Sequence, residues 1–253
     1  MEKFKNIIIT KRDREIFSLL NKIKVINSNV LTWLISKNTD VKTFVKRLKF
    51  LKQKWYIVDI RIEKVWLQVF SLSYKKENLE KIESIIWEKI YKWNIHITNS
   101  LFNHEFFIWK ALLYIKNKIE NKSWKEINIK NSYISQYELY ELQNTNNIIE
   151  KKKILEKLMI CDWLLNIWNY SFLLEVELNN SYWKFTQKLK WYKNMMLYLD
   201  SINQNFKLFK KDLILYIFVN EYKLDKYTEI IKNVWIKDLK IIVEKIENLK
   251  KVI

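Results

Sequence analysis

The chain contains no glycine and no proline, where ordinary usage gives about 7% and about 5%. Its single cysteine, Cys161, cannot form an internal disulfide and has no CxxC partner for zinc. Two histidines, His96 and His104, are too few for a histidine-rich metal site, and no nucleophile motif supports a Ser-His-Asp triad. No apolar run approaches the roughly 18 residues that span a bilayer, and the start lacks an adequate secretory core. We therefore expect a cytoplasmic protein without a membrane partner.

Tryptophan is in excess, with 12 residues, and several of them stand where a backbone favours glycine. The pair Trp168-Asn169 falls at a hairpin tip, which favours positive φ, and Trp55 falls between a lysine-rich helix and a strand. We hypothesise that many of these tryptophans are UGA codons that the organism reads as glycine. UGG codons would contradict this. Trp109, inside an apolar helix, fits a truly tryptophan-rich protein equally well. An AT-rich genome, indicated by the Lys, Asn and Ile content, would explain the missing proline.

The charge balance is strongly basic. Lys and Arg number 46 and Asp and Glu 28, which gives a formal net charge of +18. A surplus of this size favours a polyanionic partner, either nucleic acid or an anionic membrane. The 253 residues suit one large or two small domains, and a hydrophobic content of 49% is ample for a core.

Residues 1–74 have the pattern of a winged helix-turn-helix domain. Three helices are predicted over 10–23, 28–36 and 41–54, the first capped by Thr10 with Asp13 three residues later. Two strand-like runs follow, over 56–62 and 67–72. In such a domain the third helix enters the major groove of DNA while the ribbon touches the backbone.

The third predicted helix carries a basic face opposite its apolar positions. Residues near its start are candidates for contacts in the groove, and those near its end for contacts with phosphates, which give affinity rather than sequence choice. The groove candidates are Lys42, Thr43, Lys46 and Arg47, and the phosphate candidates are Lys49, Lys52 and Lys54. The alternative is a solvated basic helix in a winged helix that binds protein.

Residues 75–95 are predicted to form a connector helix and residues 96–253 a second domain. A strongly apolar helix over 100–120 is followed by a predicted strand over 124–130. The pattern continues with a loop at 144–147, a helix over 148–158, a hairpin, a helix to about residue 199 and a buried strand over 212–220. Residues 221–233 are helical, and 236–250 are either helical or begin as an edge strand. This alternation predicts an α/β domain around a small mixed sheet, so the whole chain is α+β / α/β.

The hairpin within residues 161–192 carries the candidate catalytic residues. Asp162 opens its first strand, and Glu175 and Glu177 lie two apart on the second, so both point to one face. Asp162 and Glu175 could hold Mg²⁺ through carboxylate oxygens, and Lys188 on the following helix could stabilise a phosphate. Glu105 could assist, and Glu126 could face the same site. The alternative is that these acidic residues are merely the solvent face of a strand.

Several blocks resemble the plasmid replication-relaxation protein family. The start TKRDREIFSLLNKIKVINSNVLTWLI and the run VKRLKFLKQKWYI are similar to its winged-helix half, with Trp55 where the family has glycine. The entry into the family's central helix is similar to NIHITNSLFNHEFFIWKALL. His96 and Asn99 would match the family pattern there, whereas Ser100 stands where the family has an acidic residue. CDWLLNIWNYSFLLEVELNNSYWKFTQKLKWY is similar to its signature block. The matches in that block are Asp162, Glu175, Val176, Phe185, Lys188, Leu189 and Tyr192; the departures are Cys161, Glu177 and the turn 179–181.

The resemblance implies a protein of plasmids, conjugative elements or phages whose second half is similar to the restriction-endonuclease, PD-(D/E)xK, core. Three functions stay open. The first is a DNA-binding accessory factor of replication or transfer, with double-stranded DNA as its partner. The second is a Mg²⁺-dependent endonuclease or nickase. The third is a transcriptional regulator that uses only the winged helix. Winged helices often act as dimers, so a homodimer is also considered.

Overall fold

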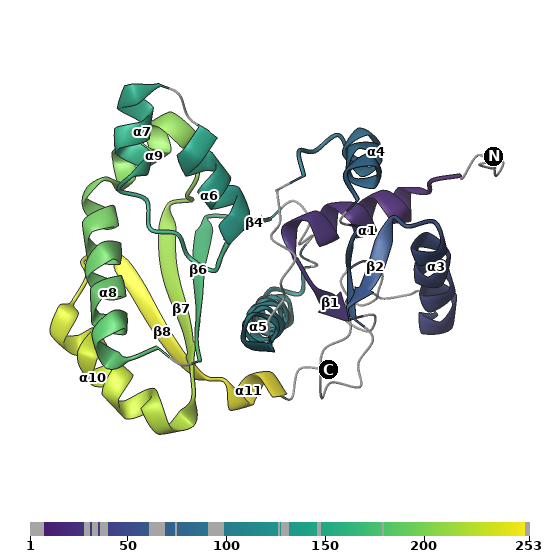
Figure 1. The fold of residues 1–253 in the computed structure, drawn as a ribbon. Coiled ribbons are helices and arrows are strands. Elements are labelled where there is room, and N and C mark those ends of the chain that lie inside the picture. The colour runs from purple at the N-terminus through teal and green to yellow at the C-terminus, as the bar shows by residue number, and fades with distance from the viewer. Residues whose placement is uncertain are drawn as a thin grey trace. The chain divides into compact units, whose positions relative to one another are not determined.

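The protein is described by a computed structural model that covers the chain apart from the following residues: 1–7, 28–30, 32–34, 36–39, 61–68, 74, 91–98, 126, 128–131, 146–147, 179 and 251–253. The chain divides into two compact units, Met1–Glu105 and Phe106–Ile253. The division falls within helix α5 (Asn99–Ser123), whereas the sequence places the second domain from residue 96. Each unit is described by itself (Figure 1).

The first unit packs helices on a small antiparallel sheet. Helix α1 (Lys11–Lys22) begins at the predicted capping box, in which the Thr10 side chain accepts the backbone N–H of Asp13 and the Asp13 carboxylate accepts that of Thr10. Thr10 thereby satisfies N–H groups that a helix start leaves unpaired. The apolar stripe of α1 buries Ile16, Phe17 and Leu20 completely.

The sheet of this unit has the strand order β1-β3-β2, and both pairings are antiparallel. Its strands are β1 (Ile26–Asn27), β2 (Ile57–Ile60) and β3 (Val69–Leu72). Helix α3 (Val41–Gln53) precedes β2 and buries Phe44, Leu48 and Leu51. The predicted helix over 28–36 lies mostly outside the described residues.

The predicted connector helix is α4 (Lys76–Ile86), and it belongs to the first unit. The residues just after it contact α1: the Ser18 hydroxyl donates to the Glu88 carboxylate at 2.8 Å, and the Asn21 amide donates to the Lys89 carbonyl at 2.9 Å. These contacts hold this segment against the first helix, so α4 is part of the unit's packing rather than a free linker.

The second unit is built on a mixed five-stranded sheet of order β4-β5-β6-β7-β8. The pairings from β4 to β6 are antiparallel, and those from β6 to β8 are parallel. The strands are β4 (Tyr133–Ser135), β5 (Trp163–Ile167), β6 (Tyr170–Glu177), β7 (Asp212–Val219) and β8 (Leu239–Lys245). The predicted small mixed sheet is therefore confirmed, and the chain as a whole is mixed α+β.

Helices cover both faces of this sheet. Helix α8 (Tyr182–Leu197) and helix α10 (Leu224–Val234), which connect the parallel strands, lie along one face (Figure 1). Leu173, Leu215 and Ile217 of the sheet share a core with the buried residues of α8. Residues of α5 contact the other face, where the rings of Tyr114 and Phe218 meet edge to face at 5.7 Å.

Some elements differ from the prediction. A strand was predicted over 124–130, but Lys125 and Ile127 are not in a strand. The sheet instead has the edge strand β4, a few residues later. Helices α6 (Gln136–Thr145) and α9 (Leu199–Phe206) were not predicted, whereas α7 (Ile149–Leu155) was. For residues 236–250 the edge-strand alternative is correct, since β8 precedes the short helix α11 (Glu247–Lys250).

Candidate functional site

The β5–β6 hairpin brings the three predicted carboxylates to one end of the sheet. Asp162 comes just before β5, and because Trp163 pairs with Leu174, Asp162 lies opposite Glu175. The backbone N–H of Asp162 donates to the Leu174 carbonyl at 3.0 Å, and its carboxylate accepts the N–H of Val176 at 2.7 Å. All three carboxylates are buried, with 9% of Asp162, 1% of Glu175 and none of Glu177 exposed. This burial contradicts the alternative of a solvent face.

Lys188 of α8 joins the two glutamates. Its ammonium donates to Glu175 Oε2 at 2.7 Å and to Glu177 Oε1 at 2.5 Å. One turn later on the same face, the Tyr192 hydroxyl donates to the other oxygen of Glu175. The Asn180 amide donates to Glu177 Oε2. We call Asp162, Glu175, Glu177, Lys188 and Tyr192 the carboxylate–lysine cluster.

The cluster holds three acidic side chains and one ammonium. Burial raises the pKa of Glu175 to about 8, because the lowering effect of Lys188 is opposed by the charges of Asp162 and Glu177. Burial would lower the pKa of Lys188, but the nearby carboxylates overcome it and raise that pKa well above its usual value. Lys188 therefore stays charged, and the protonation that relieves the excess negative charge falls on Glu175.

Cys161 and Tyr192 are both completely buried beside the carboxylates. Burial raises the pKa of the Cys161 thiol well above its ordinary value, and the charges of Glu175 and Asp162 raise it further. Burial and Glu175 have the same effect on the pKa of Tyr192. A thiol held in its neutral form is a poor nucleophile, so Cys161 acts as a core residue.

The donor set suits Mg²⁺ chemically, since it binds through one or two carboxylates and completes its shell with water and substrate phosphates. The geometry leaves little room for a metal ion. Both oxygens of Glu175 already accept hydrogen bonds, and the Lys188 ammonium bonds both glutamates. Within the described ranges no three His, Cys, Asp or Glu side chains are close enough to hold a metal ion. A cation shared by Asp162 and Glu175 would have to displace Lys188 from Glu175.

The other acidic candidates lie elsewhere or outside the described residues. Glu105 is 2% exposed within the first unit, where burial lowers the pKa of Lys24 and the charge of Glu105 partly restores it. Glu126 and His96 fall outside the described residues, as does the side chain of Asn99. The cluster therefore draws on the hairpin and on α8.

The basic face of α3 is the second candidate site, and most of its predicted residues face solvent. The exposed members are Lys42, Thr43, Lys46, Lys49, Lys52 and Lys54. Asp40 caps the helix by accepting the N–H groups of Lys42 and Thr43 at 3.2 Å each, and Lys52 forms an ion pair with Asp59 of β2. The cationic face therefore belongs to a helix that is fixed at its start and anchored near its end.

Arg47 differs from the other members of this face because it is tied to α1. Its guanidinium donates to both oxygens of Asp13, at 2.8 and 2.5 Å, and to the Ile8 carbonyl at 3.0 Å. Asp13 is completely buried, and although burial would raise its pKa, the bonds from Arg47 and Thr10 lower it below the usual value. No local sequence pattern indicates this contact, because its partners are 34 residues apart.

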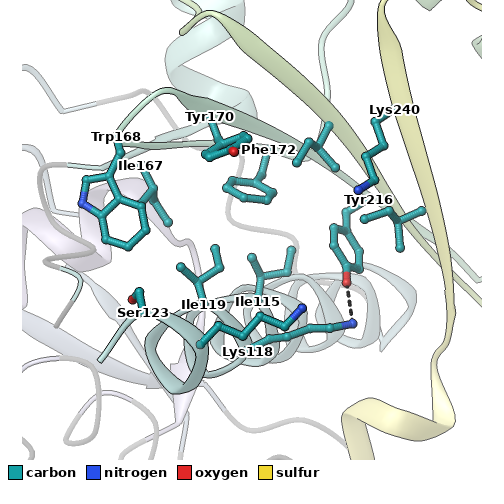
Figure 2. A pocket seen from close by; sticks show the side chains of 13 residues that line it. Ile115, Lys118, Ile119, Ser123, Ile167, Trp168, Tyr170, Phe172, Tyr216 and Lys240 are labelled. Carbon is teal, nitrogen blue, oxygen red and sulfur yellow. Dashed lines mark hydrogen bonds between the residues drawn. The ribbon is translucent and has the colours of Figure 1, made fainter. Parts of the chain in front are cut away.

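A hollow of about 430 Å³ is lined by residues of α5 and of the sheet (Figure 2). It lies on the face of the sheet opposite the cluster, because Phe172, which lines it, and Glu175 of the cluster are three residues apart on β6 and so point to opposite faces. Ile115 and Ile119 of α5 and Phe172 of β6 form part of its apolar wall. At its edge the Lys118 ammonium donates to the Tyr216 hydroxyl at 2.9 Å and to the Glu244 carboxylate at 2.8 Å. Sequence reasoning did not find this hollow, because α5 and the strands that line it are far apart along the chain.

Among the described residues, no helix is long and apolar enough to cross a membrane. No protein-family profile, curated protein or solved structure matches this chain. The resemblance to the replication-relaxation family stays a prediction.

Proposed function

We propose that this chain is a DNA-binding accessory protein of plasmid or mobile-element replication or transfer. The observation that carries the proposal is the exposed lysine face of α3, on a helix whose other side packs into the first unit. A protein with a net charge of +18 attracts polyanions over its whole surface, but a fixed row of cations on one helix offers a defined place to bind one. Such a protein would work in the cytoplasm.

The element order supports a winged helix-turn-helix in the first unit. Helix α1, strand β1, helix α3 and the antiparallel strands β2 and β3 follow one another, with β1 paired to β3. In domains of this kind a recognition helix lies in the major groove and reads base edges from its N-terminal part. Helix α3 holds the corresponding place, between the first helix and the ribbon.

We assign the contacts to DNA according to whether each side chain is exposed and whether it already bonds another residue of the first unit. Lys42 and Lys46, exposed on the first turns of α3, are the proposed groove contacts, and Lys49 and Lys54 the proposed phosphate contacts. Thr43 also hydrogen-bonds the capping Asp40, and Lys52 is paired with Asp59. Arg47 supports the helix from behind through Asp13, so we assign it a structural role.

A Mg²⁺-dependent endonuclease or nickase is the second candidate function. It is favoured by the convergence of Asp162, Glu175, Glu177 and Lys188 from a hairpin and the following helix. In that role Asp162 and Glu175 would hold the cation and Lys188 would move to the phosphate. The bond between Lys188 and Glu175 argues against a preformed metal site, so we place this function second.

A plasmid-nicking assay with Mg²⁺ separates the two functions. The accessory-protein proposal predicts binding to supercoiled plasmid without cleavage, both for the wild-type chain and for Asp162→Asn. Cleavage that is lost in Asp162→Asn, while DNA binding is kept, would instead establish the endonuclease. The asparagine variant keeps the hydrogen-bond acceptor for the Val176 N–H, so it is a milder change than alanine.

A transcriptional regulator is the third candidate, and it would use the same face of α3. Reporter assays distinguish it from the first function. Repression of the chain's own promoter, without any effect on plasmid copy number, would favour the regulator. A change in copy number or transfer frequency would favour the accessory factor. Either activity could involve a homodimer, which sedimentation of the chain with and without DNA would reveal.

A further inference from the structure

Positive backbone φ angles are concentrated at tryptophan in this protein. Three of the 12 tryptophans, at 33, 66 and 93, lie outside the described residues, which leaves nine. Five of those nine have a positive φ, and only Lys207 and Asp238 share this conformation elsewhere in the described chain. The five are Trp55 at 61°, Trp87 at 58°, Trp124 at 56°, Trp168 at 51° and Trp235 at 25°. Only a few per cent of non-glycine residues have φ > 0, so nine tryptophans should supply fewer than one.

Trp55 occupies the position after a helix that most often carries glycine. Its N–H donates to the Lys52 carbonyl at 2.9 Å, and the N–H of Tyr56 donates to the Leu51 carbonyl at 3.1 Å. These two bonds form the Schellman motif, in which the residue that follows the end of the helix has a left-handed backbone. Glycine suits this position because it has no Cβ to clash with the following carbonyl.

Three more of the five end helices in a related way. Trp87 after α4, Trp124 after α5 and Trp235 after α10 each donate their N–H to the carbonyl four residues earlier, at 2.8, 2.8 and 3.2 Å. At Trp87, with φ 58° and ψ 31°, this is the single-bond form of the left-handed cap, again a glycine position. Trp235, with φ 25° and ψ 116°, has a positive φ but lies outside the left-handed helical region. The described chain therefore has a positive φ at five helix ends. Four of them carry tryptophan, and the fifth is Lys207 after α9, whose N–H also donates to the carbonyl four residues earlier, at 2.9 Å.

The fifth residue, Trp168, is at the tip of the β5–β6 hairpin. Because Ile167 pairs with Tyr170, the loop has two residues, and Trp168 is the first of them. A positive φ at the first position of a two-residue hairpin loop is typical of the turns that favour glycine there.

The indole rings offer no packing reason for tryptophan at the helix ends. Trp87 is 86% exposed, Trp124 94% and Trp235 69%. Trp55 and Trp168 are half-exposed, and their rings contact lysine ammonium groups, with the Lys75 nitrogen 4.3 Å from the centre of the Trp55 ring. Trp168 also lines the hollow of Figure 2, so glycine would remove an indole ring from its wall.

The remaining described tryptophans show no such pattern. Trp109 and Trp163 are buried in a helix and a strand, and Trp183 and Trp191 are exposed within α8. Their backbones suit any of several residues. The glycine-like geometry therefore singles out five positions rather than tryptophan in general.

We propose that positions 55, 87, 124, 168 and 235 carry glycine in the protein as its own cells make it, because the codon at each is UGA and is read there as glycine. The chain contains no glycine at all, although four helix ends and a hairpin tip have tryptophan in the positive-φ conformation that glycine adopts most readily. The inference rests on backbone geometry and is independent of the proposed function.

Tandem mass spectrometry of the chain purified from its own cells tests the proposal directly. Peptides that span the five positions should carry the mass of glycine at each. Tryptophan at any of the five overturns the proposal, as do UGG codons in the coding DNA.

A recombinant comparison tests the backbone argument separately. Trp87→Gly and Trp124→Gly should each raise the melting temperature, by about 2–4 °C if relief of the left-handed backbone is worth about 1 kcal/mol in a chain of this size. The control is Trp191→Gly, an exchange of a 60% exposed tryptophan inside helix α8, which should lower the melting temperature. If all three variants lower it, the two helix ends do not require glycine.

Discussion

Lys188 is the residue on which the second unit's buried charges depend. Its side chain is 20% exposed, and its ammonium pairs with two glutamates that have almost no contact with solvent. A buried carboxylate is tolerated only when it is paired or protonated. With three carboxylates and one cation, the cluster keeps Lys188 charged and raises the pKa of Glu175.

Replacing Lys188 should therefore lower the free energy of unfolding by more than replacing an ordinary surface lysine does. We expect Lys188→Met to lower the free energy of unfolding at pH 7 by about 3–5 kcal/mol, the cost of leaving a buried charge unpaired. Lys184→Met, one turn earlier and exposed, should change it by less than about 0.5 kcal/mol. Urea denaturation measures both, and equal losses for the two variants would contradict the cluster's role.

The raised pKa of Glu175 predicts a pH dependence of stability. The unfolded pKa is near 4.5 and the folded pKa about 8, so the folded state binds the proton more tightly. The stability that this proton gives is complete below pH 4.5 and is lost as the pH rises through 8, with a slope of at most about 1.4 kcal/mol per pH unit.

Glu175→Gln isolates this contribution because glutamine resembles the protonated acid. Unfolding free energies of both chains across pH 5–9 should show a fall in the wild type that is weaker in the variant. Parallel curves would mean that Glu175 is already ionised at pH 5.

At the scale of elements, the pair Asp13–Arg47 links the start of α1 to the middle of α3. Asp13 is both the acidic residue of the capping box that starts α1 and the ion-pair partner of Arg47, whose side chain is 27% exposed. The orientation of the lysine face of α3 therefore depends on a contact within the first unit.

We expect Arg47→Met to destabilise the first unit by about 2–3 kcal/mol, because it leaves the Asp13 carboxylate buried with fewer partners. Lys46→Met, the neighbouring exposed residue, should be nearly neutral. Because Asp13 has a lowered pKa, the contribution of the pair is present at neutral pH and is lost as the pH falls toward and through that pKa. Thermal unfolding at pH 7 and pH 3 measures both effects. A loss for Arg47→Met that is as large at pH 3 as at pH 7 would contradict the ion pair.

Elements with a strong local signal were predictable from the sequence. The capping box of α1, the apolar stripe of α3 and the hairpin of β5 and β6 were placed within a few residues, because period and cap chemistry are local. The strand β4 has only three residues and helix α6 follows it at once, so neither shows a clear period. The prediction for the β8 region was left open between a helix and an edge strand, because a short run of apolar residues fits both.

The carboxylate–lysine cluster was also predictable only as far as local spacing reaches. The spacing of Glu175 and Glu177 indicated a shared face, and the four-residue spacing of Lys188 and Tyr192 indicated one helix stripe that both occupy. The sequence could not show that Lys188 bonds both glutamates, or that Arg47 is taken up by Asp13. Both contacts depend on how separate elements pack, which no local pattern encodes.

At the scale of the whole molecule, the chain combines a small unit that exposes a row of lysines on α3 with a larger mixed-sheet unit in which the buried Glu175 and Glu177 are paired with Lys188. The central claim is that the first unit binds double-stranded DNA through the exposed lysines of α3. Each phosphate contact releases condensed counterions, so binding through those lysines must weaken with salt.

The most direct test is the salt dependence of the chain's affinity for duplex DNA. Lys46→Ala combined with Lys49→Ala should weaken binding and reduce the slope of log K against log salt concentration by about 1–2. The matched control, Lys152→Ala with Lys153→Ala, removes two exposed lysines from α7 in the second unit and should leave the slope nearly unchanged. An unchanged slope in the α3 variant, or an equal loss in the control, would contradict the claim.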